Sequence, residues 1–197
     1  PLLYQGGYLT IKDYDPITHG FTLGIPNKEV RAGLMENLLP FYSGKSDGQS
    51  LGFAALFYRD LMHGEIDAAM EKMKAYFASI PYPDGGKDVL ADVQKSEYYY
   101  ETILYVLLSM MNVATFTQVK SCRGRADAVM FAPTTIFVFE IKINKSAKQA
   151  LAQIDDKGYM IPYKADERKL YKVGISFSTT NRTLEDWDWE EVKKNVG

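Results

Sequence analysis

The stretch GRADAVMFAPTTIFVFEIKI, residues 124–143, restricts the fold of this chain more than any other part of the sequence. Its two runs of Val, Ile, Phe and Ala are typical of β-strands, and the APTT between them is typical of a turn. If APTT closes a hairpin, Phe131 pairs with Ile136, and Asp127 then lies opposite Glu140. The stretch therefore predicts two paired strands that carry charged residues inside apolar runs.

Side chains alternate between the faces of a strand, so Asp127, Glu140 and Lys142 are expected on one face. In this register the two carboxylates lie about 5 Å apart, where like charges repel. A bound cation, a neighbouring ammonium or a shared proton would offset the repulsion. Lys142 supplies one positive charge, and a divalent ion would use both carboxylates as ligands. The alternative is an exposed face with three ordinary charged residues. The opposite face is apolar and should pack on a helix; it comprises Phe137, Phe139, Ile141 and Ile143.

Composition places the chain among cytoplasmic globular proteins. It has 197 residues, a formal net charge of −2 and one cysteine, Cys122, so an internal disulfide is excluded. No signal peptide is visible, and the longest apolar stretch, ILYVLLSMMNVA, is too short to cross a membrane. The net charge argues mildly against a dedicated nucleic-acid binder. Six basic residues between Lys120 and Lys148, against two acidic ones, indicate either a solvated face or a contact with a polyanion.

The segment PYPDGGKD, residues 81–88, interrupts the helical pattern and suggests a boundary between residues 1–85 and 86–197. The first part predicts two short strands around a turn, then a helix capped by Asn27 and two more helices. The second part predicts an α/β fold with a mixed sheet flanked by helices, because its strand–helix–strand unit implies a parallel crossover. Its expected elements are a helix over 95–112, strands over 116–121, 125–131 and 136–143, a helix from Ser146 to Lys157, and a strand over 170–178.

Asp127 followed by Glu140-Ile141-Lys142 at the end of the next strand resembles the signature of the PD-(D/E)XK nuclease superfamily. The order helix, three strands, helix, strand is similar to that superfamily's restriction-endonuclease-like core. The blocks GRADAVMF, FEIKINKSAKQALAQIDDKGY and LYKVGISFS look like bacterial proteins in which such a domain follows an AAA-ATPase-like domain. The resemblance covers roughly residues 96–187. Residues 1–85 then look like the tail of the upstream ATPase-like module, and this chain looks like the C-terminal part.

This resemblance implies metal-dependent hydrolysis of phosphodiester bonds in nucleic acid, DNA in the first place. Asp127 and Glu140 would bind Mg²⁺ or Mn²⁺, and the carbonyl of Ile141 would add an oxygen ligand. Lys142 would orient or activate the attacking water and stabilise charge on the phosphate. Ala126 stands where the family's motif has proline, whereas all three residues of the core motif are present. The resemblance leaves open how many ions bind and whether the chain forms a homo-oligomer.

The resemblance also names residues around this core. A carboxylate on the first helix aligns with Glu97, and Glu101, one turn further on, is the fallback. Gln153 and Tyr159 match a QI–KGY block and are candidates for substrate contact; for Gln153, capping or core packing is the alternative. The substrate-binding candidates also include two of the local basic residues, Arg125 and Lys145.

A module that keeps this fold without cutting, and serves binding or regulation for an ATPase, is the competing function. Other sites are disfavoured. PDGGKD lacks the spacing of a phosphate-binding P-loop. His19 and His63 lie far apart in the sequence without cysteine partners, so a zinc site is not expected. EDWDWEE near the end is acidic and should point away from a nucleic-acid site.

Overall fold

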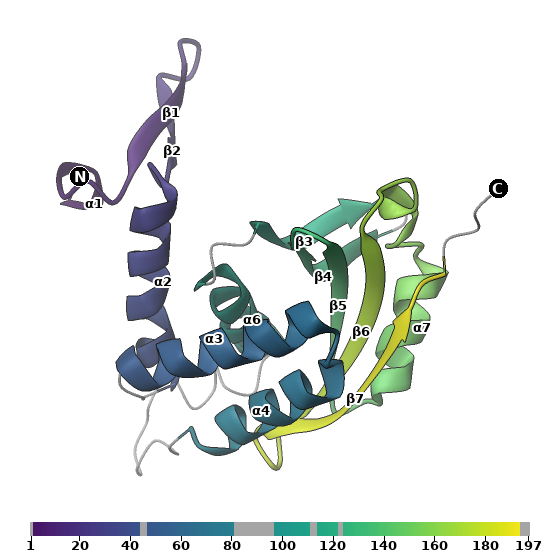
Figure 1. The fold of residues 1–197 in the computed structure, drawn as a ribbon. Coiled ribbons are helices and arrows are strands. Elements are labelled where there is room, and N and C mark those ends of the chain that lie inside the picture. Colours follow the sequence, from purple (N-terminus) through teal and green to yellow (C-terminus); the bar gives the residue numbers. More distant parts are fainter. Residues whose placement is uncertain (1, 44–46, 81–96, 111–113, 122–123, 194–197) are drawn as a thin grey trace.

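The computed structural model describes residues 2–43, 47–80, 97–110, 114–121 and 124–193. Among these residues no helix is long and apolar enough to cross a membrane. Strands between residues 114 and 191 form a five-stranded sheet, and helices cover both of its faces (Figure 1). The predicted mixed α/β fold is therefore confirmed.

The strand order of the sheet is β3-β4-β5-β6-β7. Strands β5 and β6 are parallel, and every other neighbouring pair is antiparallel. The parallel pair requires a crossover, which α7 provides. The strands are β3 (Ala114–Ser121), β4 (Gly124–Phe131), β5 (Thr135–Ile143), β6 (Lys169–Ser178) and β7 (Thr183–Glu191).

Helices cover the two faces of the sheet unequally. On one face lie α3, α4 and α6, and on the other lies α7 (Figure 1). The larger core is on the side of α6 and contains Phe137, Phe139 and Ile141, as the apolar face of the sequence predicted. The smaller core lies under α7. The bounds are α3 (Asp47–His63), α4 (Ile66–Ala78), α6 (Glu97–Met110) and α7 (Ala147–Asp156), with a short 3₁₀ helix at Ile161–Tyr163.

Helix α7 has the ends that the sequence predicts. The Ser146 hydroxyl accepts the N–H of Gln149, and the Gln149 side chain accepts the N–H of Ser146, which completes a capping box. Gly158, just beyond the helix, has φ 64°, a left-handed conformation that suits glycine. This helix fixes the crossover between β5 and β6.

Gly174→Ala should destabilise the protein by about 1–3 kcal/mol, because the added methyl has no room. A Cβ at Gly174 on β6 would collide with the carbonyl oxygen of Ala147 and lie 3.0 Å from the Cβ of Ala150. Gly52→Ala is the matched control, since nothing lies within 4 Å of its Cβ position inside α3 and alanine favours the helix. Urea unfolding of both variants checks this; equal stabilities would contradict close packing of α7 on β6.

Helices α3 and α4 belong to the same core as the sheet. Tyr100 of α6 stacks on Phe177 of β6 at a ring centroid distance of 4.2 Å, and Phe77 of α4 meets the same ring edge-on at 4.8 Å. The predicted boundary near residue 85 falls outside the described residues. The segment EDWDWEE lies in strand β7, an element that the sequence reading did not predict.

The N-terminal part contains the predicted hairpin and helices. The strands β1 (Thr10–Asp15) and β2 (Gly20–Gly24) form a two-stranded sheet that projects from the rest of the chain (Figure 1). A short helix, α1 (Leu2–Gln5), precedes them, and α2 (Lys28–Ser43) follows. The side chain of Asn27 accepts the N–H of Val30 at 2.8 Å, so the predicted N-cap of α2 is confirmed.

Candidate metal and phosphodiesterase site

The charged residues of the stretch 124–143 lie where β4 and β5 separate. The predicted pairing of Phe131 with Ile136 is confirmed, and the ladder continues as far as Ala128 and Phe139. It ends one pair before Asp127 and Glu140. Beyond that point the side chain of Asp127 takes over from the main chain, because its Oδ2 accepts the N–H of Ile141 at 2.7 Å. The Asp127 carboxylate is therefore fixed against the strand that carries the other charged residues.

Strict alternation does not hold at Asp127, which corrects the geometry expected from the sequence. Ala126 packs in the core under α7, whereas Ala128 packs in the core under α6, although alternation would place them on one face. The irregularity coincides with Gln118, which has φ 52° and no partner in the β3–β4 ladder. The Asp127 carboxyl consequently meets Glu101 of α6, with which it forms a hydrogen bond.

Glu140 and Lys142 form an ion pair inside the protein. The Lys142 Nζ donates to Glu140 Oε1 at 2.8 Å and to the carbonyl oxygen of Ile141 at 3.1 Å. Glu140 is only 1% exposed, and its Oε2 is buried and accepts no hydrogen bond that meets ordinary geometry. An unsatisfied carboxylate oxygen inside a protein costs free energy, so it points to a partner that completes the site.

Burial and mutual repulsion shift the acidity of the two carboxyls. Burial, reinforced by the negative charge of Asp127 and opposed by Lys142, raises the pKa of Glu140 to about 7. Burial also raises the pKa of Asp127, although the Ile141 N–H and the hydrogen bond with Glu101 oppose the shift. At neutral pH the site therefore holds acidic groups whose ionised forms are poorly stabilised by the protein alone.

The first helix supplies a third carboxyl group. Glu101 lies beside Asp127 and accepts a hydrogen bond from Gln118 Nε2 at 2.8 Å. Glu97 starts α6, but its side chain is outside the described residues. The structure thus brings the fallback residue of the sequence prediction to the site. Gln118 was not singled out from the sequence, although the β4 register places it opposite Asp127.

These residues fit a divalent cation. Mg²⁺ and Mn²⁺ prefer oxygen ligands, and Mg²⁺ commonly uses one or two carboxylates together with water. The buried Oε2 of Glu140 is a ligand atom without a partner, and the Ile141 carbonyl lies next to it in the chain. Within the described ranges, no group of three Asp, Glu, His or Cys side chains is arranged to hold an ion unaided. The remaining ligands would be the main-chain carbonyl and water.

In the absence of divalent metal, Glu140 should make stability fall with rising pH. Between pH 4.5, the ordinary pKa, and about 7, the folded protein keeps a proton that the unfolded chain has released. Higher pH therefore favours unfolding, by about 3 kcal/mol over this window. Urea unfolding at several pH values, with Glu140→Gln as the control, measures the contribution. The wild type should lose stability relative to the variant; parallel pH profiles would contradict the raised pKa.

The substrate candidates Gln153 and Tyr159 lie together in a supporting position. The Tyr159 hydroxyl accepts the main-chain N–H of Arg125 at 3.2 Å and the Gln153 side-chain amide at 3.4 Å. Tyr159 is 4% exposed, within the core under α7. The buried Tyr159 therefore anchors the start of β4. The Arg125 side chain is exposed, and its charge lowers the pKa of Asp127.

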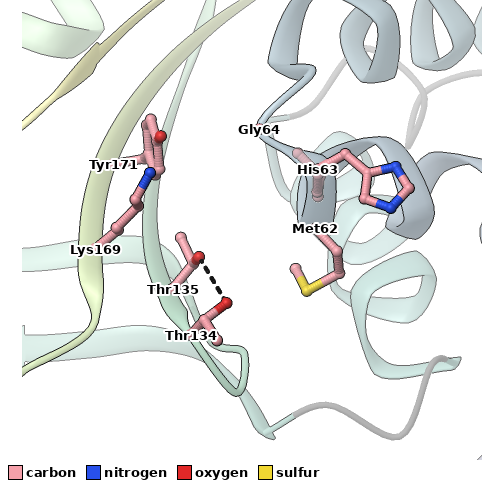
Figure 2. A pocket seen from close by; sticks show the side chains of 8 residues that line it. Met62, His63, Gly64, Thr134, Thr135, Lys169 and Tyr171 are labelled. Carbon is pink, nitrogen blue, oxygen red and sulfur yellow. Dashed lines mark hydrogen bonds between the residues drawn. The ribbon is translucent and has the colours of Figure 1, made fainter.

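Lys145, the remaining substrate candidate, follows the end of β5. It is exposed and lines an open pocket of about 440 Å³ together with Asn144, Ser146, Ser176, Glu185 and Asp186. A second pocket, of about 180 Å³, lies at the opposite end of β5, between the end of α3 and the beginning of β6 (Figure 2). Its lining includes His63, Thr134, Thr135 and Lys169 and no carboxylate, so it is separate from the Asp127–Glu140 site.

Comparison with known proteins relates the second part of the chain to one family. No solved structure matches the chain. A curated relative from Azotobacter chroococcum mcd 1, named "Uncharacterized protein in vnfD 5'region", is 28% identical over 187 residues, which cover 93% of this chain and 36% of the relative. The chain thus spans about a third of that relative's length. Residues 95–187 match the family model of the PD-(D/E)XK nuclease superfamily, and the mixed sheet flanked by helices is consistent with the restriction-endonuclease-like fold of that superfamily.

Proposed function

We propose that this protein hydrolyses phosphodiester bonds of nucleic acid with the help of Mg²⁺ or Mn²⁺ bound at Asp127 and Glu140. The observation that carries the proposal is the buried Oε2 of Glu140, which accepts no hydrogen bond of ordinary geometry where β4 and β5 separate, although the Asp127 main chain lies close enough to lower the pKa of this carboxyl. The match of residues 95–187 to a superfamily made up generally of nucleases supports the same chemistry. DNA is the first substrate to test. RNA is tested as well, because the proposal rests on the phosphodiester backbone that the two share.

Each residue has a separate role in the proposed reaction. Asp127 is oriented by the Ile141 N–H, and its carboxylate would bind the ion in place of the hydrogen bond with Glu101. Glu140 contributes its unpaired oxygen, and the Ile141 carbonyl adds a neutral donor. A bound divalent ion lowers the pKa of a coordinated water and stabilises negative charge on the phosphate. Glu101, which lies beside Asp127, would accept a proton from this water network.

Lys142 would act on the substrate. Its side chain is 15% exposed, and its ammonium is held between Glu140 and the Ile141 carbonyl at the rim of the site. An ammonium in this position attracts a phosphate oxygen and stabilises the charge that develops during attack by water. Once the Glu140 charge is shared with a metal ion, Lys142 is less strongly held by the carboxylate and can serve the phosphate instead.

A panel of labelled DNA and RNA oligonucleotides, single-stranded and duplex, tests the proposal with Mg²⁺ or Mn²⁺. Wild type should cleave at least one class, and EDTA should stop the reaction. Asp127→Ala and Lys142→Ala should each lose activity, and Lys164→Ala, an exposed lysine elsewhere, should keep it. Unchanged cleavage in both site variants would exclude the proposal.

A module that binds without cutting is the second candidate. One observation favours it: the Lys142 ammonium already neutralises Glu140, so the carboxylate has a cation of the protein's own. In this reading the partner would be an ATPase-like module, of which residues 1–85 would be the tail, as the resemblance of the sequence implies. Calorimetric titration with Mn²⁺ separates the two functions, because the binding module should take up no metal at Asp127 and Glu140.

A further inference from the structure

Two positive side chains lie directly opposite each other at the start of β4. Lys120 of β3 is the cross-strand partner of Arg125 of β4, and both side chains are exposed. Like charges in this arrangement repel each other. Neither side chain forms an ion pair with any other residue that the structure describes. The charge of Asp127 offsets this repulsion only in part, and an anion bound between the two side chains would relieve it further.

The backbone that carries this pair is firmly anchored. The Arg125 N–H is bonded to the buried Tyr159 hydroxyl, and a Cβ at Gly124 would lie only 2.8 Å from that hydroxyl. The close approach requires glycine at this position. On the neighbouring strand the Ser121 hydroxyl donates to the carbonyl of Gly124 at 3.2 Å. The main chain that carries the two side chains is therefore held in place before any ligand binds, and this reduces the entropy lost on binding.

The pair faces the side of the sheet on which Asp127 meets α6. Val119 and Ala126 pack in the core under α7. Their neighbours Lys120 and Arg125 point to the other side by alternation. Arg125 precedes Asp127 by only two residues on β4. A phosphate held by the pair would consequently lie next to the carboxylates of the proposed metal site.

The opposite edge of the sheet has the reverse charge. Strand β7, Thr183–Glu191, carries five acidic residues and no basic residue. Glu190 pairs with Lys172 of β6 at 2.9 Å, which neutralises only one of the five. A polyanion is thus repelled from the β7 edge and attracted to the β3 edge. The charge difference across the sheet gives a nucleic acid one favourable direction of approach.

We propose that Lys120 and Arg125 form a phosphate clamp that binds the sugar–phosphate backbone of a nucleic acid beside the Asp127–Glu140 site and leads the strand past β3. The clamp rests on the proposed function for its ligand, because its chemistry recognises phosphodiester groups. It reads no base sequence. DNA and RNA share this backbone, so the test includes both.

Fluorescence anisotropy of labelled DNA and RNA oligonucleotides, measured in EDTA to prevent cleavage, tests the clamp. The variants are Lys120→Ala, Arg125→Ala and the double variant. Lys193→Ala removes the same charge just beyond the β7 edge and is the control. Each single clamp variant should weaken binding about 3–10-fold at 0.1 M salt. The double variant should lower the slope of log K against log salt concentration by about 1.5, since each phosphate contact contributes about 0.7–0.9.

Stability and kinetics complete the test. The exposed substitutions should leave the thermal midpoint unchanged or slightly raised at low salt, because they remove a repulsion. In cleavage assays the loss in kcat/KM should come through KM. A double variant with wild-type affinity and salt slope would overturn the clamp, as would wild type that binds no oligonucleotide. If binding depends on the clamp but no cleavage occurs, the clamp is retained and the nuclease is rejected. If the double variant binds and cleaves as wild type does, the nuclease is retained and the clamp is rejected.

Discussion

Glu140→Gln should reduce metal-dependent cleavage by about 10²–10³-fold and at the same time make the protein more stable at pH 8. The substitution keeps the shape of the side chain and removes a carboxylate ligand. It also removes a charge that burial and Asp127 disfavour, as the pKa of about 7 shows. Loss of function with a gain in stability is characteristic of residues that are kept for chemistry rather than for folding. Cleavage rates and urea unfolding, both at pH 8, measure the two effects.

Lys142→Ala provides the opposing case. It should also abolish cleavage, but it leaves Glu140 buried without its ammonium partner and should therefore lower stability at pH 8. At pH 5, where Glu140 carries a proton, this loss of stability should largely disappear. Glu185→Gln, an exposed position on β7, is the matched control for both assays. Destabilisation by Glu140→Gln, or wild-type cleavage in that variant, would contradict the account.

Phe177→Ala should destabilise the protein by about 3–5 kcal/mol, the largest effect expected in the core. Phe177 is fully buried on β6 and contacts the rings of Phe77 and Tyr100, so it joins α4 and α6 to the sheet. Its removal leaves a cavity that three elements share. Phe21→Ala is the matched control, because Phe21 on β2 is 59% exposed and should contribute little.

The same variant reports on how the helices before residue 80 unfold. If α3 and α4 share one core with the sheet, unfolding followed by tryptophan fluorescence and by circular dichroism should give a single transition, displaced to lower urea. Trp187 and Trp189 suit this purpose, since the indole N–H of each donates to Asp67 of α4. Two separate transitions, only one of which responds to Phe177→Ala, would contradict a common core.

The sequence predicted the parts of this fold that depend on neighbours in the chain. The APTT turn and the alternation of apolar residues gave the register of β4 and β5, because a short loop allows few pairings. Ser146 and Gly158 marked the ends of α7 for the same local reason. The nearness of Asp127 to Glu140 was expected from that register, although the ladder ends one pair before them and Asp127 departs from strict alternation.

Other features depend on contacts that are distant in sequence. Strand β7 looks like an acidic segment in the sequence, because its two tryptophans alternate with carboxylates. The tryptophans contact an α4 residue about 120 positions away, which the sequence does not reveal. The choice of Glu101 at the site depends on how α6 lies on the sheet, which helical periodicity does not determine. The positive φ of Gln118 could not be predicted from the sequence, because this conformation is uncommon at residues other than glycine.

Calorimetric titration of Mn²⁺ into the metal-free protein at pH 8 tests the central claim most directly. The account predicts saturable binding to wild type that is lost or strongly weakened in Asp127→Asn and in Glu140→Gln, with binding retained in Glu185→Gln. Circular dichroism of each variant confirms that it is folded. Absence of binding to the wild type, or equal binding to wild type and both site variants, would show that Asp127 and Glu140 do not form a metal site.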